Sequence, residues 1–408
     1  MNKKKIINDP VYGFISIPDG LIFNLIEHRY FQRLRHIKQT GMTHLVYPGA
    51  LHTRFYHALG AMHLMSLAIE TLRNKGHQIS EEEEEAVTIA ILLHDVGHGP
   101  FSHALEHTIV TGVSHEDISS LLMEKLNEEF QGRLSMAINI FNDTYPRRFL
   151  HQLVSGQLDM DRLDYLNRDS FFTGVTEGIV GSDRIIKMLN IIDDQIVVEE
   201  KGIYSVEKFL IARRLMYWQV YLHKTGIAAE QVLAKILVRS RELALAGKEL
   251  FCSPPLCHFL YNTISREDFI HNPEHLNIFT KLDDTDIMSA IKIWVDCDDV
   301  VLSTLCRNLV YRNLLHVEIT ALPPNADLVT SLLAKAADYY KIDIELARYF
   351  VFTDTILNNA YKVDDTNIRI LMKDNTIKDI TDASDSASLA ALAKTVKKFI
   401  TCYPKFLA

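Results

Sequence analysis

Apolar residues recur three and four positions apart through most of the first 245 residues of the chain. This spacing places them on one face of an α-helix, so the pattern predicts a largely helical structure. Glycines follow several of the apolar runs, as is typical of helix ends. The predicted helices cover residues 21–39, 53–75, 81–96, 115–129, 147–167 and 206–245. Ser80 is the expected N-cap of the third helix, because a run of glutamates follows it.

Alternating patterns predict a few short strands between the helices. Residues 11–17 alternate as a strand and end at a Pro-Asp-Gly turn. Residues 194–204 are expected to form a hairpin, with a strand over 195–199 and a turn at Lys201-Gly202.

The pattern changes beyond Gly247. Alternating runs at 315–322 and 367–371 predict strands, and a terminal helix is expected over 383–399. We therefore predict a domain over residues 1–248 and an α+β region over 249–408. The second region carries no readable chemical motif, so a structural or oligomerising role is expected for it.

Composition narrows the class of protein. With 408 residues, of which 48% are hydrophobic and 23% charged, the chain can bury a sizeable core. The net charge of -9 excludes a strongly basic nucleic-acid scaffold, so nucleic acid is not an expected partner. Because the chain is acidic overall, an anionic ligand would need a pocket that is locally positive. No apolar run approaches the roughly 20 residues that cross a bilayer. The odd number of cysteines, 5, and the lack of a secretory signal predict reduced thiols without disulfides and a cytoplasmic location.

The distribution of histidines along the chain indicates where a chemical site lies. Of the 18 histidines, most lie in the first 120 residues, and His94-Asp95 stands where an apolar helix would otherwise continue. Burying an imidazole and a carboxylate there is costly unless a cation lies between them, and both groups are ligands of divalent metals. His98 follows one helical turn later and can face the same cavity. These residues predict a metal site.

Two further segments strengthen this interpretation. His57 lies on the preceding predicted helix with Arg54 one turn before it, and the segment 159–169 contains four aspartates. A purely structural helix rarely concentrates acids in this way.

The order His57, His94-Asp95 and Asp161 resembles the signature of the HD-domain metal-dependent phosphohydrolases. The flanking segments 31–39, 47–50, 53–60, 94–103 and 221–225 resemble the deoxynucleoside triphosphate triphosphohydrolase (dGTPase-like) branch of that family. The similarity covers residues 10 to 240. It implies a mainly α fold, with an all-helical HD-domain core and small β-hairpins, followed by the smaller α+β C-terminal region.

The resemblance also implies the site. One divalent ion, which can be Mn, Fe, Mg, Zn, Co or Ni, would be held by His57, His94, Asp95 and Asp161. Asp159 competes with Asp161, because spacing alone does not separate them. His115 would be the general acid with Glu106 as its partner carboxylate, and Glu116 and Asp117 are alternatives to Glu106. The substrate would be bound by Gln39, Arg54, His98, His103, Arg162, Tyr165, Asp169, Arg213, Tyr221 and Lys224.

The implied activity is hydrolysis of dNTPs to deoxynucleoside and triphosphate by metal-activated water attack on the α-phosphorus. Two alternatives stay open. The chain could be an HD phosphohydrolase acting on another nucleotide (GTP, an alarmone or a monophosphate), or a nucleotide-sensing module with little catalysis. The resemblance also implies a homo-oligomer, a dimer or a tetramer, and leaves open an activating nucleotide.

Overall fold

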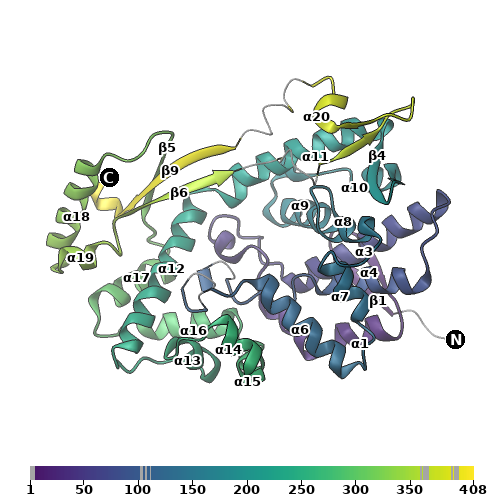
Figure 1. Ribbon diagram of the computed structural model, residues 1–408. Coiled ribbons are helices and arrows are strands. Elements are labelled where there is room, and N and C mark those ends of the chain that lie inside the picture. Colours follow the sequence, from purple (N-terminus) through teal and green to yellow (C-terminus); the bar gives the residue numbers. More distant parts are fainter. Residues whose placement is uncertain are drawn as a thin grey trace.

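A computed structural model describes residues 5–101, 104–105, 108–110, 112–358, 361, 367–386, 389 and 395–408. Helices dominate it, which confirms the mainly α fold (Figure 1). The helices of the first part are α1 (Leu21–Glu27), α2 (Arg29–Gln32), α3 (Arg54–Asn74), α4 (Glu81–Leu93), α6 (His115–Glu129), α7 (Ser135–Phe141), α8 (Arg148–Val154), α9 (Met160–Thr173), α10 (Ser182–Met188), α11 (Ile203–Met216) and α12 (Lys224–Leu245). Those of the second part are α13 (Pro254–Leu260), α14 (Arg266–His271), α15 (Pro273–Phe279), α16 (Asp284–Trp294), α17 (Val300–Val310), α18 (Ala326–Tyr340), α19 (Ile344–Ala347) and α20 (Ile380–Ala383).

Three small sheets accompany the helices. The strands are β1 (Lys5–Asp9), β2 (Gly13–Ile17), β3 (Leu189–Ile192), β4 (Gln195–Glu199), β5 (His316–Thr320), β6 (Phe352–Asn358), β7 (Arg369–Leu371), β8 (Ile377–Asp379) and β9 (Val396–Tyr403). They form the sheets β1-β2, β3-β4-β7-β8 and β5-β9-β6. Strand β7 pairs in parallel with β4 in the register Val198↔Ile370, so the C-terminal region extends a hairpin of the first part.

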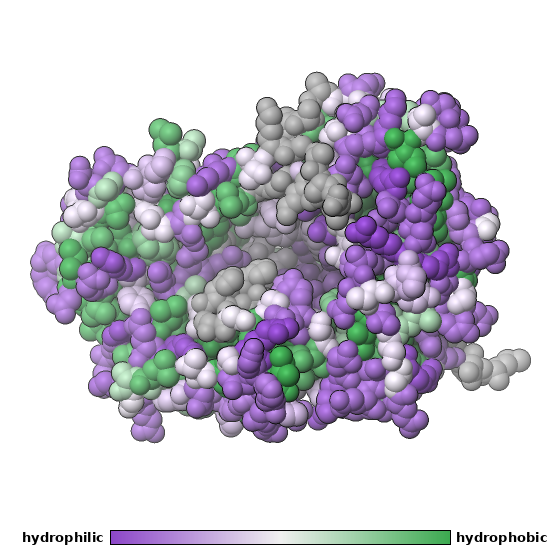
Figure 2. Space-filling view, viewed as in Figure 1, coloured by the Kyte–Doolittle hydropathy of each residue, from purple (hydrophilic) through white to green (hydrophobic). Residues whose placement is uncertain are grey.

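The main hydrophobic core runs through the described chain from Ile15 to Cys402, and a smaller cluster lies at α18 and α19. The centre of the main core is α3, whose apolar side chains are buried almost all round and which packs on α4 and α9. The division predicted between residues 248 and 249 stays a prediction. Hydrophilic residues dominate the face seen in Figure 2, and apolar side chains are scattered among them. Within the described residues, no helix has the length and apolar character that a membrane crossing requires.

Three of the long predicted helices are interrupted by local capping. His28 is extended and its side chain accepts a hydrogen bond from Tyr30 N–H, which starts α2. Asp159 caps α9 and separates it from α8. A π-helical turn over Tyr217–Tyr221 and a cap at His223 separate α11 from α12. Polar side chains that bond the backbone compete with helix continuation, and the apolar period does not reveal them.

The hairpin prediction has the wrong turn. Its turn lies at Asp193-Asp194 between β3 and β4, and not at Lys201-Gly202, which lies in a short 3₁₀ segment. Both aspartates have positive φ, 51° and 58°, which a tight hairpin turn requires and which Asp tolerates.

The C-terminal helix prediction is wrong over residues 384–386, which are irregular, and over residues 396–399, which belong to β9. This strand lies between β5 and β6, and its residues Ile400 and Cys402 are buried. Long-range pairing therefore overrides the local apolar period there.

The prediction of no disulfides is also wrong. Cys252 and Cys257 are joined, with their Cα atoms 5.4 Å apart, whereas Cys297, Cys306 and Cys402 are free. The chain turns into α13 between the two residues, and an odd cysteine count carries no information about such local geometry.

Candidate active site

Three helices bring the predicted metal ligands together. His57 lies one turn into α3, His94 and Asp95 follow the last residue of α4, and Asp161 lies in the first turn of α9. Helix α3 packs against both α4 and α9, so the three segments meet beside the N-terminal half of α3.

The four side chains converge on one point. Asp161 Oδ1 lies 3.1 Å from His57 Nε2 and 3.5 Å from His94 Nε2. Asp95 Oδ1 lies 3.4 Å from His94 Nε2, and Asp95 Oδ2 lies 3.8 Å from His57 Nε2. Two ligands about 2.0–2.2 Å from one ion, at right or tetrahedral angles, lie roughly 3.0–3.5 Å apart. The separations among His57, His94 and Asp161 therefore fit one shared divalent ion. Asp95 adjoins both histidines of this group and also groups with His98 and His115.

Two buried nitrogen atoms support this fit. His57 Nε2 and His94 Nε2 are buried and have no hydrogen-bond partner among the described residues. The Nδ1 atom of His94 lies 2.6 Å from Ile91 O and that of His57 lies 2.8 Å from Asp164 Oδ2, so both Nδ1 atoms are donors. Buried polar atoms are normally bonded. When a ring is neutral with its proton on Nδ1, its Nε2 lone pair faces the carboxylates, as in a metal ligand.

The electrostatics are those of a cation site. Burial lowers the pKa of His57, but the adjoining Asp161 and Asp164 outweigh burial and raise that pKa to about 10. Burial raises the pKa of Asp161, but His57 and His94 outweigh burial and lower it. The pocket thus favours positive charge between its carboxylates, and a divalent ion supplies that charge without a proton.

A buried ionic network that the sequence analysis missed supports His57 from behind. Asp164 accepts hydrogen bonds from Arg168 Nε at 2.9 Å and Nη2 at 3.0 Å, and Arg168 Nη1 donates to Asp9 Oδ2 at 2.8 Å. The side chains of Asp164 and Arg168 are fully buried. Their spacing of four positions was visible in the sequence, but nothing there indicated burial or contact with His57.

Asp159 lies apart from the ligand group. Its carboxylate accepts hydrogen bonds from Gly156 N–H and Arg162 N–H, both at 2.7 Å, and pairs with the Arg162 guanidinium. These contacts occupy Asp159 as the cap of α9, so the geometry favours Asp161 as the ligand.

A guanidinium group and an imidazole adjoin the other side of Asp95. Arg54 Nη1 lies 2.5 Å from Asp95 Oδ2, and His98 Nε2 lies 3.2 Å from Asp95 Oδ1. The His98 ring stacks on His115 with centroids 3.8 Å apart. Burial and the Arg54 charge lower the pKa of His98 to about 3, so its imidazole is neutral at physiological pH.

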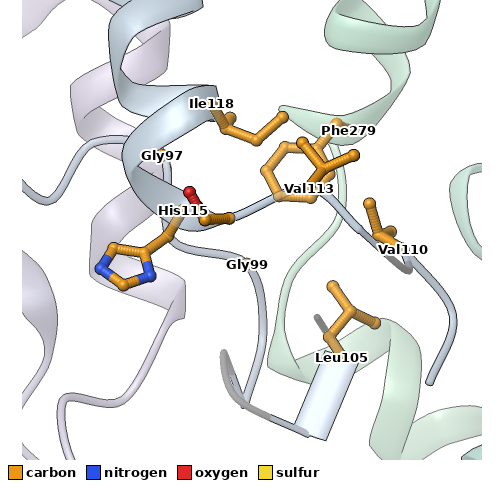
Figure 3. Close-up of a pocket in the computed structure, with 9 residues that line it drawn as sticks. Gly97, Gly99, Leu105, Val110, Val113, His115, Ile118 and Phe279 are labelled. Atoms are coloured by element: carbon orange, nitrogen blue, oxygen red, sulfur yellow. The ribbon is translucent and has the colours of Figure 1, made fainter. Parts of the chain in front are cut away.

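His115 opens α6 and also lines a pocket with Gly97, Gly99 and Phe279. Figure 3 shows its ring pointing away from the group formed by Val113, Ile118 and Phe279. The predicted partner Glu106 and the predicted phosphate ligand His103 lie outside the described residues. Of the alternatives, Glu116 Oε1 is 3.3 Å from His115 Nε2, whereas Asp117 caps α6 and pairs with Arg266.

The predicted nucleoside-binding residues gather around Asp169. Its carboxylate accepts hydrogen bonds from Tyr221 OH at 2.5 Å and from His52 Nε2 at 2.7 Å. The Tyr165 and Tyr221 rings meet edge to face, with centroids 6.3 Å apart. His52 had no assigned role in the sequence, and its position five residues before His57 was the only signal.

The remaining predicted substrate ligands differ in their surroundings. Gln39 Oε1 and Arg213 Nε and Nη1 are buried without hydrogen-bond partners among the described residues. Arg162 is held by Asp159, and Lys224 is exposed at the start of α12. Of these four residues, Gln39 and Arg213 thus have buried polar atoms that a ligand could bond.

Known proteins match this architecture. Residues 54–169 match the HD domain, and residues 180–249 match the HD associated region. The uncharacterized protein YwfO of Bacillus subtilis is 34% identical over 359 residues, 84% of this chain and 79% of that protein. The deoxynucleoside triphosphate triphosphohydrolase SAMHD1 homolog of Dictyostelium discoideum is 34% identical over 60% of this chain, which spans 51% of that relative.

A solved structure covers almost the whole chain. The crystal structure of a phosphohydrolase from Bacteroides thetaiotaomicron matches with a TM-score of 0.95 and 56% identity, over 98% of this chain and 100% of that one. The convergent His and Asp side chains, the HD domain match and these relatives agree, and the chain belongs to the HD-domain phosphohydrolase family.

Proposed function

We propose that the protein hydrolyses dNTPs to deoxynucleoside and triphosphate, by attack of water on the α-phosphorus. The observation that carries the proposal is the convergence of His57, His94 and Asp161, with Asp95 adjoining both histidines and Arg54 and His98 beside it. SAMHD1 relatives from Dictyostelium discoideum and Homo sapiens, named deoxynucleoside triphosphate triphosphohydrolases and 34% and 29% identical, support the substrate class.

The metal ligands in this proposal are His57, His94, Asp95 and Asp161. A divalent ion (Mn, Fe, Mg, Zn, Co or Ni) supplies an acidified water and polarisation of the phosphorus centre when bound. Asp164 holds the tautomer of His57, so that Nε2 faces the ligand group.

His115 donates the proton that the leaving 5′-oxygen needs. It stacks on His98 beside Asp95, and its Nε2 adjoins Glu116. Glu106 is the partner that the family resemblance implies for His115. A positioned acid of this kind contributes about 10²–10⁴-fold to a rate.

The triphosphate requires cations on a chain with a net charge of -9. In our proposal the phosphate ligands are Arg54, His98, His103, Arg162, Arg213 and Lys224. Binding of a phosphate oxygen by Arg54 competes with its contact to Asp95, and binding by Arg162 competes with its contact to Asp159.

The nucleoside end is assigned to Gln39, Tyr165, Asp169 and Tyr221. Asp169, fixed by His52 and Tyr221, would accept a hydrogen bond from the sugar hydroxyl, and Tyr165 would pack against the sugar. We further propose a cytoplasmic homo-oligomer, a dimer or a tetramer, as the family resemblance implies.

Product analysis tests the proposal. The purified chain is incubated with each dNTP and NTP plus Mn²⁺ or Mg²⁺, and the products are separated by ion-exchange chromatography. We expect deoxynucleoside and triphosphate from wild type, and a loss of about 10²–10⁴-fold in His115→Asn. His271→Asn, an exposed histidine of α14, serves as the matched control and keeps full activity. Release of phosphate or pyrophosphate, or turnover of only GTP, an alarmone or a monophosphate, would contradict the proposal.

A further inference from the structure

A second pocket, of about 100 Å³, is lined by none of the residues assigned above. Its walls are α8, the segment 155–158, strand β4 and the residues that lead into β7. The lining residues are Asp143, Arg148, His151, Gln152, Ser155, Gly156, Gln157, Leu158, Ile196, Val198, Asn367, Ile368 and Arg369. Because the β4–β7 pairing supplies one wall, the pocket needs both parts of the chain.

The pocket combines an apolar floor with a positively charged edge. Leu158, Val198 and Ile368 are buried, with 7%, 1% and 4% exposure. The lining contains two guanidinium groups, those of Arg148 and Arg369, and one carboxylate, that of Asp143. Asp143 Oδ2 lies 3.6 Å from Arg148 Nε. The lining is therefore net positive on a chain whose net charge is -9.

The edge also has the hydrogen-bonding capacity for a polar ligand. Arg369 Nη1 donates to Gln195 Oε1 at 2.5 Å, which uses one of the five N–H donors of the guanidinium. Gln152 accepts from Ile196 N–H at 2.8 Å through Oε1, so its amide nitrogen keeps its own two donors. Ser155 is exposed at the same wall.

We propose that this pocket binds a small organic anion. Its phosphate or carboxylate group lies between Arg148 and Arg369, and its apolar or flat body lies on Leu158, Val198 and Ile368. Guanidinium groups bind both kinds of oxyanion in a bidentate manner. An apolar lining with a few polar groups is typical of small-molecule sites.

The same wall continues into the metal-ligand helix. Gly156 N–H donates to Asp159 Oδ2 at 2.7 Å, and Asp159 caps α9 two residues before Asp161. An anion that contacts the segment 155–158 would therefore shift the Gly156–Asp159 hydrogen bond and, with it, the N-cap that positions Asp161. Occupancy of the pocket is linked in this way to the proposed catalytic site, and this step alone rests on the proposed function.

Isothermal titration calorimetry of the full chain tests binding with three probes: adenosine monophosphate, glucose 6-phosphate and citrate. They separate a nucleoside phosphate, a phosphorylated sugar and a carboxylate as the source of the anion. At least one probe is expected to bind, and Arg148→Gln with Arg369→Gln is expected to weaken it at least tenfold. The control pair is Arg133→Gln with Arg348→Gln, which removes the same charge from two exposed arginines paired with glutamates.

A further variant, Ser155→Tyr, fills the pocket without removing a charge and should also weaken binding. It serves as the test if the double arginine variant does not fold. Failure of all three probes to bind, full affinity in both pocket variants, or an equal loss in the control pair overturns the proposal.

A separate measurement tests the link to Asp161. The probe that binds is added to a dNTP hydrolysis assay, and kcat or KM is expected to change in wild type and not in the double arginine variant. Unchanged kinetics in wild type with proven binding would overturn the link and leave the binding site standing. Absence of any hydrolysis would overturn the proposed function and not the calorimetric result.

Discussion

Asp164 Oδ2 lies 2.8 Å from His57 Nδ1, and both side chains are fully buried. The carboxylate accepts a hydrogen bond from Nδ1–H, because Arg168 and His57 lower the pKa of Asp164 despite its burial and keep it ionised. His57 is therefore fixed in the tautomer whose Nε2 faces Asp95 and Asp161. A carboxylate behind a histidine ligand raises the basicity of the ring and fixes its orientation.

Asp164→Asn should weaken metal binding by about 10–100-fold, since loss of an outer partner of a histidine ligand typically has that effect. The substitution should also lower the free energy of unfolding by about 3 kcal/mol, because it breaks a buried ion pair. We expect the lower end of the usual range because Arg168 keeps its second carboxylate partner, Asp9. Calorimetric Mn²⁺ titration and urea unfolding measure the two effects. Asp296→Asn, with a side chain 87% exposed, is the control and should change neither. Equal Mn²⁺ affinity in wild type and Asp164→Asn would show that Asp164 does not tune His57.

Asp159 and Asp161 should separate into a structural and a ligand role. Asp161→Ala should abolish bound metal, measured by elemental analysis, while circular dichroism shows that the helices are retained. Asp159→Ala should keep the metal but lose about 0.5–2 kcal/mol of stability, because it removes the cap of α9. In wild type and Asp159→Ala, Mn²⁺ at 100 times its Kd should raise the free energy of unfolding by about 2.7 kcal/mol. In Asp161→Ala the same Mn²⁺ concentration should leave that free energy unchanged. Metal loss in Asp159→Ala with full binding in Asp161→Ala would reverse the assignment.

The sequence could predict most of the helices and the convergence of His57, His94 and Asp161, but not the residues that support them. His94-Asp95 interrupts an apolar run, so the free-energy cost of burying these two polar side chains could be inferred from the local sequence. The contact of Asp164 with His57 depends instead on how α9 packs against α3, and that of Arg168 with Asp9 joins residues 159 positions apart. Strand β9 likewise depends on its partners β5 and β6. Long-range contacts of this kind leave no periodic signal in one sequence.

Gly60 lies on α3 one turn after His57, where the Asp164–Arg168 pair crosses the helix. A Cβ atom at this position would overlap Asp164 Oδ1 and Arg168 Nη2, which are themselves held in place by burial. Gly60→Ala should therefore cost about 1–3 kcal/mol of unfolding free energy. Gly226→Ala in α12 is the control: its Cβ would meet nothing nearer than Val220 O at 4.0 Å, and it should gain about 0.5–1 kcal/mol. A neutral Gly60→Ala in urea unfolding would mean that the pair adapts without cost.

His44 should make the stability depend on pH below neutrality. Burial lowers the pKa of His44 from its usual 6.5, and Lys38 lowers it further, whereas the Gly41 carbonyl and Asp284 oppose the shift. Because the folded pKa lies below the unfolded one, the unfolded chain binds more protons below pH 6.5, and stability falls as the pH falls. The loss from this group is expected between about pH 7.5 and pH 5.5, around the unfolded pKa. Urea unfolding of His44→Gln should show a correspondingly smaller loss over that interval than wild type, since the other titrating groups are common to both. An equal loss in the two proteins would place the pH dependence elsewhere.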